Sequence, residues 1–460
     1  MTARDEVMLD LIRPQYAPNS EVLLSAVVQP CYEAAEDKAR SGFRFLNRNP
    51  QSKNEVTAPV DAAGYESFAA QLAAQGIKTN GTSEDLARAV VAAVTGVGSG
   101  KATSLPASPM APHLALAQDL AGVLGSNPPN LGKALEHMFL MGEAPDDPGP
   151  DSLAESWLEA ASARRDSEPL LAGIDEAFNY AHSSGPFSRN DKVGPSLNPT
   201  WRGAFPKSPY GWFNRSWRRL MDPAWIDLMP TRVWTDWVTT VLRTALAFGY
   251  LAEMRWYELM GEAMLGRDSI DTLPVLDREE LLPWPPSRLP VSSRNVKTDI
   301  RLLVNRGTSM RELLDRQLAS AGDVPGASAL EALRLDPEVR SLVVRALGGH
   351  EPPRSEKNVR ETITYALQQR GTDSNSDYYG LLKNHGSRYA VVSPGTEWMA
   401  VVASLACDPS GQTNVGQVLS EIECLGMLPE VQELVGALEA AGMARGSADA
   451  DHGVRVRSAF

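Results

Sequence analysis

One apolar stretch, residues 230–265, constrains the fold of this chain more than any other feature. Its sequence, PTRVWTDWVTTVLRTALAFGYLAEMRWYELMGEAML, can form one long helix that begins at Pro230. Proline suits the first helical turn because a backbone N–H at that position would have no partner within the helix. Apolar residues occupy most of the helical circumference rather than one stripe, which is typical of a helix buried on all sides. The sequence therefore predicts a buried central helix.

Tryptophan is concentrated around this predicted helix. Seven of the ten tryptophans lie between Trp201 and Trp256. Large aromatic side chains stabilise cores, so packing within and between domains is the simpler interpretation. A stacking surface for bases or a ligand is the alternative, because arginines are interleaved with these aromatics. The interleaved arginines are Arg215, Arg218, Arg219, Arg232, Arg243 and Arg255.

The rest of the chain is organised by two proline-rich segments. A chain of 460 residues is long for one core and predicts about three domains. EAPDDPGPD at 143–151 and LLPWPPSRLP at 281–290 mark the boundaries. We expect a mainly α, multi-domain helical protein with a small C-terminal α+β module. Its units are an N-terminal helical domain over 1–142, an aromatic-rich central helical domain over 152–280, a basic-biased helical segment over 291–375 and a C-terminal module over 378–460.

The C-terminal module has the most legible order of elements. A strand candidate, YAVVS, leads into three helices that begin near Pro394, Thr413 and Leu428, and GVRVRSAF alternates like a closing strand. Three helices with short turns and a strand resemble a winged-helix module in layout. In its DNA-binding use, that layout implies a third helix that enters the major groove.

The charge of the third helix disfavours DNA binding by this module. The helix carries Glu430, Glu433 and Glu439 and no lysine or arginine before Arg445. From 391 to 460 there are nine acids and three arginines. Because carboxylates repel phosphates, we predict that the module docks protein through these glutamates rather than DNA.

A glycine-rich run, GVGSGK at 96–101, resembles a phosphate-binding loop but departs from the pattern. The G-x-x-x-x-G-K-[ST] motif requires glycine where Thr95 stands and a metal-binding hydroxyl where Ala102 stands. Prolines at 106, 109 and 112 preclude the helix that must follow such a loop. We interpret the run as a loop after a helix that begins at Ser83.

No other pattern indicates catalysis. The six histidines are isolated, so no metal-binding pair is evident. The sequence predicts no catalytic residue, metal or cofactor. KNHGSRY at 383–389 gathers Lys383, His385 and Arg388 in a glycine-containing loop. This segment could contact an anion, and a plain loop is the simpler alternative.

Net charge limits the partners. A charge of −13 excludes a protein whose whole surface binds nucleic acid but allows a local basic patch. The candidate contacts are Arg215, Arg218 and Arg219 beside the aromatics, and Arg294, Lys297 and Arg301 in the basic stretch 288–316.

The sequence predicts a cytoplasmic location. The charged N-terminus has no continuous apolar run, so we expect no signal peptide. TALAFGYLA at 244–252 falls short of the roughly 20 apolar residues that span a bilayer, so we expect no membrane partner.

Two classes of function follow. The first is a non-catalytic adaptor or scaffold subunit of an intracellular, bacterial-type multi-protein assembly, with nucleic acid as an allowed partner. The alternative is an enzyme whose site is assembled from sequence-distant residues around the tryptophan-rich centre.

Overall fold

The computed structural model describes a mainly helical chain, as expected. The described residues are 2–14, 21–29, 62–94, 109–117, 131–146, 149–150, 152–181, 197–266, 269–319, 321–349, 356–369, 377–444 and 454–460. In these ranges the chain forms eighteen α-helices and four short strands. Over the same ranges, no helix has both the length and the apolar character needed to cross a membrane.

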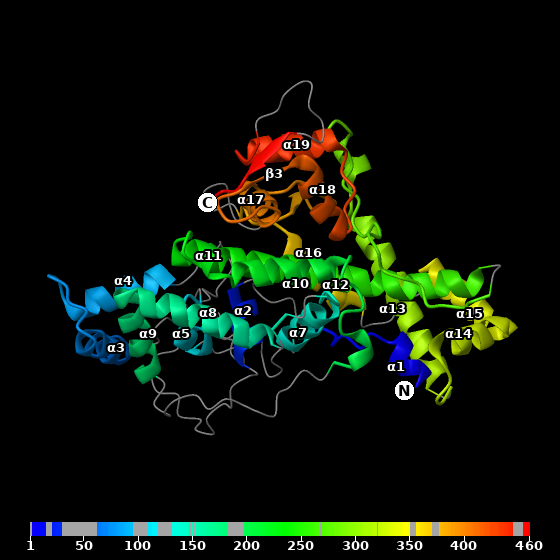
Figure 1. Ribbon diagram of the computed structural model, residues 1–460, viewed down its shortest axis with the longest axis horizontal. Helices are drawn as coiled ribbons and strands as arrows, with labels where there is room; N and C mark the ends of the chain where they lie inside the picture. The colour runs from blue at the N-terminus through cyan, green and yellow to red at the C-terminus, as the bar shows by residue number, and fades with distance from the viewer. Residues whose placement is uncertain are drawn as a thin grey trace.

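The long helix predicted from the sequence is α12 (Thr231–Leu265). Pro230 caps it from the position just before the first helical residue, and Gly266 ends it. Figure 1 shows α12 running along the long axis of the molecule, with the C-terminal unit on one side and the N-terminal helices on the other. Leu242, Leu246 and Tyr250 are 0% exposed. The predicted buried central helix is therefore confirmed.

Helices from distant parts of the sequence surround α12. They are α2 (Glu21–Val28), α7 (Leu131–Met141), α10 (Pro209–Leu220), α13 (Lys297–Leu318), α15 (Pro337–Gly348) and α16 (Glu356–Leu367). The seven tryptophans between Trp201 and Trp256 are each at most 4% exposed. Trp201 meets Trp256 edge to face, with 5.6 Å between ring centroids. Their indole rings are therefore core, which agrees with the packing interpretation.

The remaining helices extend the assembly at both ends of α12. Towards the N-terminus they are α1 (Ala3–Val7), α3 (Ala62–Ala74), α4 (Ser83–Val94), α5 (Pro112–Ala117), α8 (Leu153–Ser167) and α9 (Pro169–Ala181). Further along the chain are the 3₁₀ turns η2 (Pro199–Trp201) and η3 (Val291–Arg294), and the helices α11 (Pro223–Ile226) and α14 (Gly326–Leu335). The glycine-rich run at 96–101 lies outside the described residues, although α4 begins at Ser83 as predicted.

The C-terminal unit combines helices with two small antiparallel sheets. Strand β1 (Leu382–His385) pairs with β2 (Tyr389–Val392), and β3 (Gln412–Asn414) pairs with β4 (Arg455–Arg457). Between them lie α17 (Thr396–Leu405), α18 (Val415–Cys424) and α19 (Val431–Ala440). The three predicted helices and the closing strand are observed. The segment 383–389, interpreted as a loop, is instead the turn and flanking strands of the β1–β2 hairpin.

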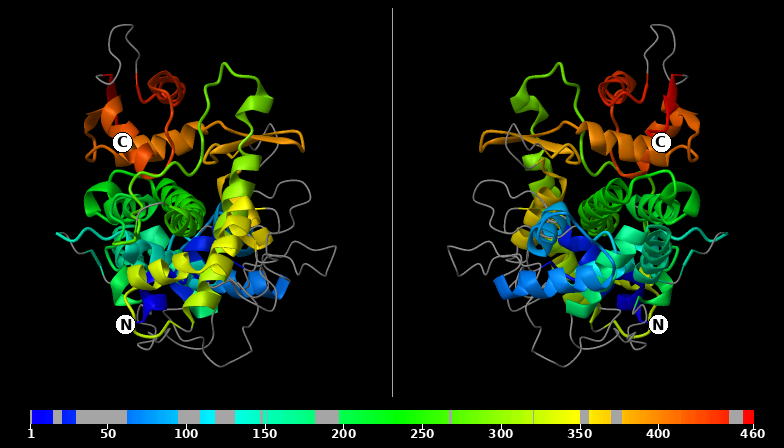
Figure 2. Two further views of the ribbon diagram at one scale, coloured as in Figure 1. Left: turned by 90° about the vertical axis from the view of Figure 1, so that its right-hand side faces the viewer. Right: turned by 90° about the vertical axis from the view of Figure 1, so that its left-hand side faces the viewer.

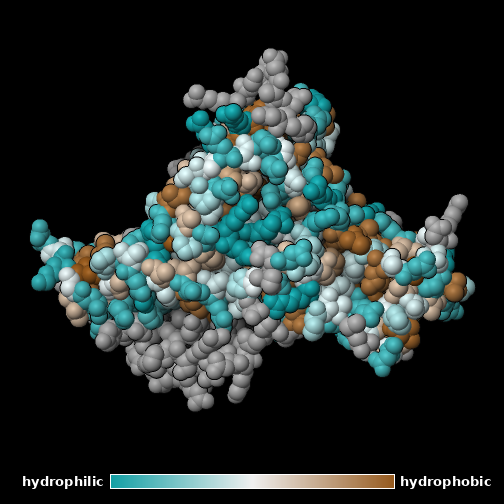
Figure 3. Space-filling model, in the orientation of Figure 1, coloured by the Kyte–Doolittle hydropathy of each residue, from teal (hydrophilic) through white to brown (hydrophobic). Residues whose placement is uncertain are grey.

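One hydrophobic core joins all these parts. Its buried members include Ala3, Trp157, Val304 and Val418, one from each predicted unit. A second, smaller core lies among α3, α5 and α9. The predicted units thus share a core in space, and their boundaries stay predictions. Figure 3 shows that hydrophilic residues cover most of the face seen in Figure 1.

Candidate functional site

A hollow of about 480 Å³ lies where the first turns of α13 meet α16 and the β1–β2 hairpin. We call it the basic pocket. The side chains that matter for its chemistry are Lys297, Arg301, Arg360, Tyr365, Asn384 and Arg388. Figure 2 shows the hairpin (orange) projecting beside α13 (light green). Three segments that are far apart in the sequence therefore build one concave wall.

Backbone hydrogen bonds fix the hairpin against the start of α13. The backbone N–H of Val296 donates to the carbonyl of Ala390 at 2.9 Å. The amide oxygen of Asn295 accepts from the backbone N–H of Ala390 at 3.0 Å. Lys297 Nζ donates to the carbonyl of Ser387 at 2.8 Å. These bonds hold the turn of the hairpin, and Arg388 after it, over the N-terminal end of α13.

A buried arginine fixes the third wall. Arg243 of α12 donates to the carbonyls of Ala366 (3.0 Å) and Gln368 (3.2 Å), at the end of α16. The same guanidinium pairs with Asp377 at 2.8 Å. The last carbonyls of a helix have no partner within it, so a buried cation there stabilises the helix end. Arg243 was grouped with the aromatics in the sequence, and it serves to position α16.

The pocket carries an excess of positive charge. Four cationic side chains line it against one carboxylate, Glu361, which lies 3.8 Å from Lys357. Arg360 pairs with Glu356 at 3.1 Å. Within the described part of the chain, Arg301 and Arg388 form no ion pair. A local field of this sign in a chain of net charge −13 marks a site that attracts anions.

Comparison with protein-family models, with curated proteins and with solved structures finds no match. The site is therefore interpreted from its own chemistry. Within the described ranges, no group of three or more histidine, cysteine, aspartate or glutamate residues is placed to hold a metal ion.

A second hollow shows how charges are arranged where they are matched. It measures about 190 Å³ and lies between α12, α13 and the segment after α12. Its Arg255 pairs with Glu258 (2.8 Å), Glu262 (2.9 Å) and Glu279 (3.0 Å). Arg306 pairs with Glu258 at 3.1 Å. Here each guanidinium has carboxylate partners, whereas Arg301 and Arg388 have none among the described residues.

The structure brings together one of the two predicted groups of basic residues. Lys297 and Arg301 line the basic pocket. Arg294 lies in η3, immediately before α13, and its Nε is buried without a hydrogen-bond partner in the described part of the chain. Arg388, in the segment noted for anion contact, joins them from the hairpin. The helical positions Arg360 and Tyr365 were not singled out from the sequence.

The other predicted group lies on α10, away from the pocket wall. Arg215 pairs with Glu421 of α18 at 2.8 Å and donates to the carbonyl of Pro206 at 3.0 Å. It therefore ties α10 to the C-terminal unit. Arg218 and Arg219 are half-buried on the same helix, and neither lines the basic pocket.

Two of the three glutamates predicted to dock protein contact the chain itself. Glu430 accepts two hydrogen bonds from Arg288, at 2.8 and 2.9 Å. These bonds lower the pKa of its carboxyl. Glu433 accepts a hydrogen bond from Ser287 at 3.0 Å. The proline-rich segment 281–290 is thus held along the start of α19, while Glu439 is exposed at the other end of that helix.

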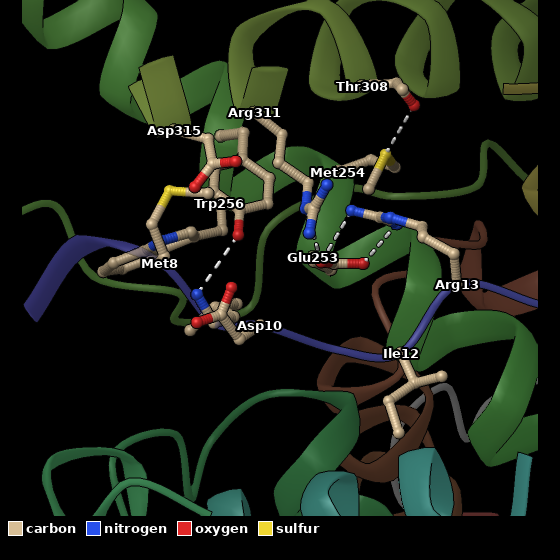
Figure 4. Close-up of polar contacts among 12 residues, drawn as sticks. Met8, Asp10, Ile12, Arg13, Glu253, Met254, Trp256, Thr308, Arg311 and Asp315 are labelled. Atoms are coloured by element: carbon tan, nitrogen blue, oxygen red, sulfur yellow. Dashed lines mark hydrogen bonds and ion pairs between the residues drawn. The ribbon is translucent and has the colours of Figure 1, made fainter. Parts of the chain in front are cut away.

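A buried ion cluster closes the N-terminal segment over α12 and α13. Figure 4 shows Arg13 and Arg311 pointing toward Glu253. The carboxylate is 0% exposed, accepts two hydrogen bonds from Arg13 and lies 3.9 Å from Arg311. The hydroxyls of Tyr250 and Tyr257 bind the backbone of the same N-terminal segment, at Ile12 and Leu9. Every charge in this cluster faces another part of the chain, so its role is structural.

Proposed function

We propose that this chain is a non-catalytic adaptor that binds nucleic acid at the basic pocket and a protein partner through its acidic C-terminal unit. The observation that carries the proposal is the convergence of Lys297, Arg301, Arg360 and Arg388 on one hollow of an otherwise acidic molecule. Local positive charge of this kind is the electrostatic footprint of nucleic-acid binding.

The chemistry of the pocket suits phosphates. A guanidinium presents its N–H groups in a rigid fork that matches two phosphate oxygens, and Arg301 and Arg388 are not engaged by carboxylates of the described residues. The first turn of α13 adds backbone N–H groups and the positive end of the helix dipole, since its cap residue, Val296, makes no side-chain cap. Both features favour a polyanion at this wall.

The adaptor part of the proposal rests on the opposite charge of the C-terminal unit. The order of α17, α18, α19 and β4 supports the resemblance to a winged-helix layout, which stays a proposal, as does the intracellular location. Glu430 and Glu433 are already engaged with the chain, so the exposed end of α19 around Glu439 is the better candidate for docking. An enzyme site around the tryptophan-rich centre has less support, because those rings pack against one another.

The experiment is a binding titration with a labelled mixed-sequence oligonucleotide. Affinity should fall by on the order of tenfold or more between 50 and 200 mM salt, because bound phosphates release counterions. Arg301→Glu and Arg388→Glu should each weaken binding by about tenfold and flatten the salt dependence, since each removes a phosphate contact and adds repulsion. Fluorescence anisotropy of the oligonucleotide measures both effects.

A matched control lies on the same helix. Arg316 is near the other end of α13, and its side chain donates to the carbonyl of Glu312. Arg316→Glu changes the net charge by the same amount, and we expect wild-type affinity. Equal weakening by all three variants, or binding that does not respond to salt, would contradict a site at the basic pocket.

A further inference from the structure

An aromatic ring stands in the basic pocket beside the cations. The side chains that α16 contributes to the wall include Glu361, Thr364, Tyr365 and Gln368, whose spacing places them on one face of the helix. Tyr365 is 44% exposed, in contrast to the buried tryptophans around α12. A ring that is exposed inside a cationic hollow offers a surface for another planar group.

Polar groups that can meet the edge of a base surround this ring. The side-chain amides of Gln368 and Asn384 line the same hollow, and neither has a hydrogen-bond partner among the described residues. Each amide provides both a donor and an acceptor. On the facing side, Thr298 and Arg301 lie three residues apart on α13 and so share a face. The pocket therefore combines cations, one ring and two amides within a single concavity.

The concave shape discriminates between forms of nucleic acid. A duplex keeps its bases stacked inside and is read by a convex element, a helix or a two-stranded ribbon, that enters a groove. An unpaired base can leave the strand, enter a hollow and stack on an aromatic side chain while its phosphates stay on neighbouring cations. A hollow of about 480 Å³ falls within the range of pockets that hold one small ligand.

We infer that the basic pocket accepts one unpaired nucleotide, with its base stacked on Tyr365 and its phosphates on Arg301 and Arg388, so that the preferred ligand is single-stranded nucleic acid. The inference rests on the proposed function, because it assigns the form of nucleic acid to the same site. The competing arrangement is a duplex tracked by the projecting β1–β2 hairpin, which carries Lys383 and His385 at exposed positions.

The test compares single-stranded and duplex oligonucleotides of equal length, bound to the full chain at 50 mM salt. The single strand should bind at least about tenfold more tightly than the duplex. Tyr365→Leu should weaken single-strand binding by roughly five- to 150-fold, the range for loss of one base stack. Tyr365→Phe keeps the ring and should retain most of the affinity. Duplex binding should be unchanged by either substitution, because it does not use the ring.

The control is a second exposed tyrosine that does not line the pocket. Tyr378 is 54% exposed, and Tyr378→Leu should leave single-strand affinity at the wild-type level. If Tyr365→Leu and the wild type bind equally while Arg301→Glu weakens binding, the stacking inference is wrong and the proposed nucleic-acid site stands. A duplex preference with the same response to Arg301→Glu would favour the hairpin arrangement and also overturn the inference. If neither form binds at 50 mM salt, both the inference and the proposed function are wrong.

Discussion

Replacing Arg13 by alanine is expected to lower the free energy of unfolding by about 3–5 kcal/mol, because it leaves a buried carboxylate without its main partner. Glu253 is 0% exposed, and Arg13 donates to both of its oxygens, at 2.8 and 2.9 Å. Arg311 is 3.9 Å from the nearer oxygen and cannot replace those bonds without moving. Urea denaturation followed by tryptophan fluorescence measures the loss.

The loss should depend on pH. Burial raises the pKa of Glu253 above its ordinary value of 4.5, and the charges of Arg13 and Arg311 oppose that rise. The folded state therefore binds a proton more readily than the unfolded state above pH 4.5, and the contribution of this group to stability falls as pH rises through that window. Without Arg13 the pKa rises further, so the variant should lose more stability at pH 8 than at pH 5.

Two variants test this explanation. Arg4, on the same N-terminal segment, pairs with Asp10 and Asp315 at the surface, and Arg4→Ala should cost less than about 1 kcal/mol. Replacing both Arg13 and Glu253 by methionine removes both charges and should recover most of the stability lost in Arg13→Ala. An Arg13→Ala protein as stable as Arg4→Ala, or one whose loss does not change with pH, would contradict the assignment.

The central helix could be predicted from the sequence because its signals are local. Proline at its start and apolar residues around its circumference specify both an end and an environment, and α12 begins one residue after Pro230. The same holds for the helices of the C-terminal unit. Strands β1 and β3 were not predicted, because LKNH and QTN are short and polar and owe their structure to the strands that pair with them.

The basic pocket could be predicted in part. Arg294, Lys297 and Arg301 stand close together in the sequence, so their proximity needs no knowledge of the fold. Arg360 and Tyr365 belong to an amphipathic helix whose polar face resembles any solvated face until α13 and the hairpin lie beside it. Residues brought together only by tertiary packing leave no local pattern in the sequence.

Charge pairing across the fold explains the other differences. Arginines among aromatics look the same in sequence whether they face solvent or a distant carboxylate, and Arg215 meets Glu421 of α18. Arg13 and Glu253 are 240 positions apart, so no spacing rule could have joined them. Glu430 looked free to dock a partner because the position of Arg288 beside it depends on the path of the proline-rich segment.

Substituting Gly307 by alanine is expected to destabilise the fold by about 3 kcal/mol, through overpacking at the contact between α12 and α13. A Cβ atom at Gly307 would lie 2.5 Å from the carbonyl oxygen of Met254 and 2.6 Å from its Cα. Backbone atoms of a buried helix cannot turn aside as the end of a flexible side chain can. The two helices must therefore separate, which also strains the contacts of Arg306 and Arg311 with α12.

The sign of this effect makes the prediction sharp. By helix propensity alone, alanine in place of glycine stabilises a helix by about 1 kcal/mol. Gly436 in α19 is exposed, and a Cβ there would meet open space, so Gly436→Ala should gain up to that amount. The two substitutions are chemically identical, and urea denaturation should move their midpoints in opposite directions. A gain at both positions would mean that α12 and α13 do not approach as closely as the contact at Gly307 requires.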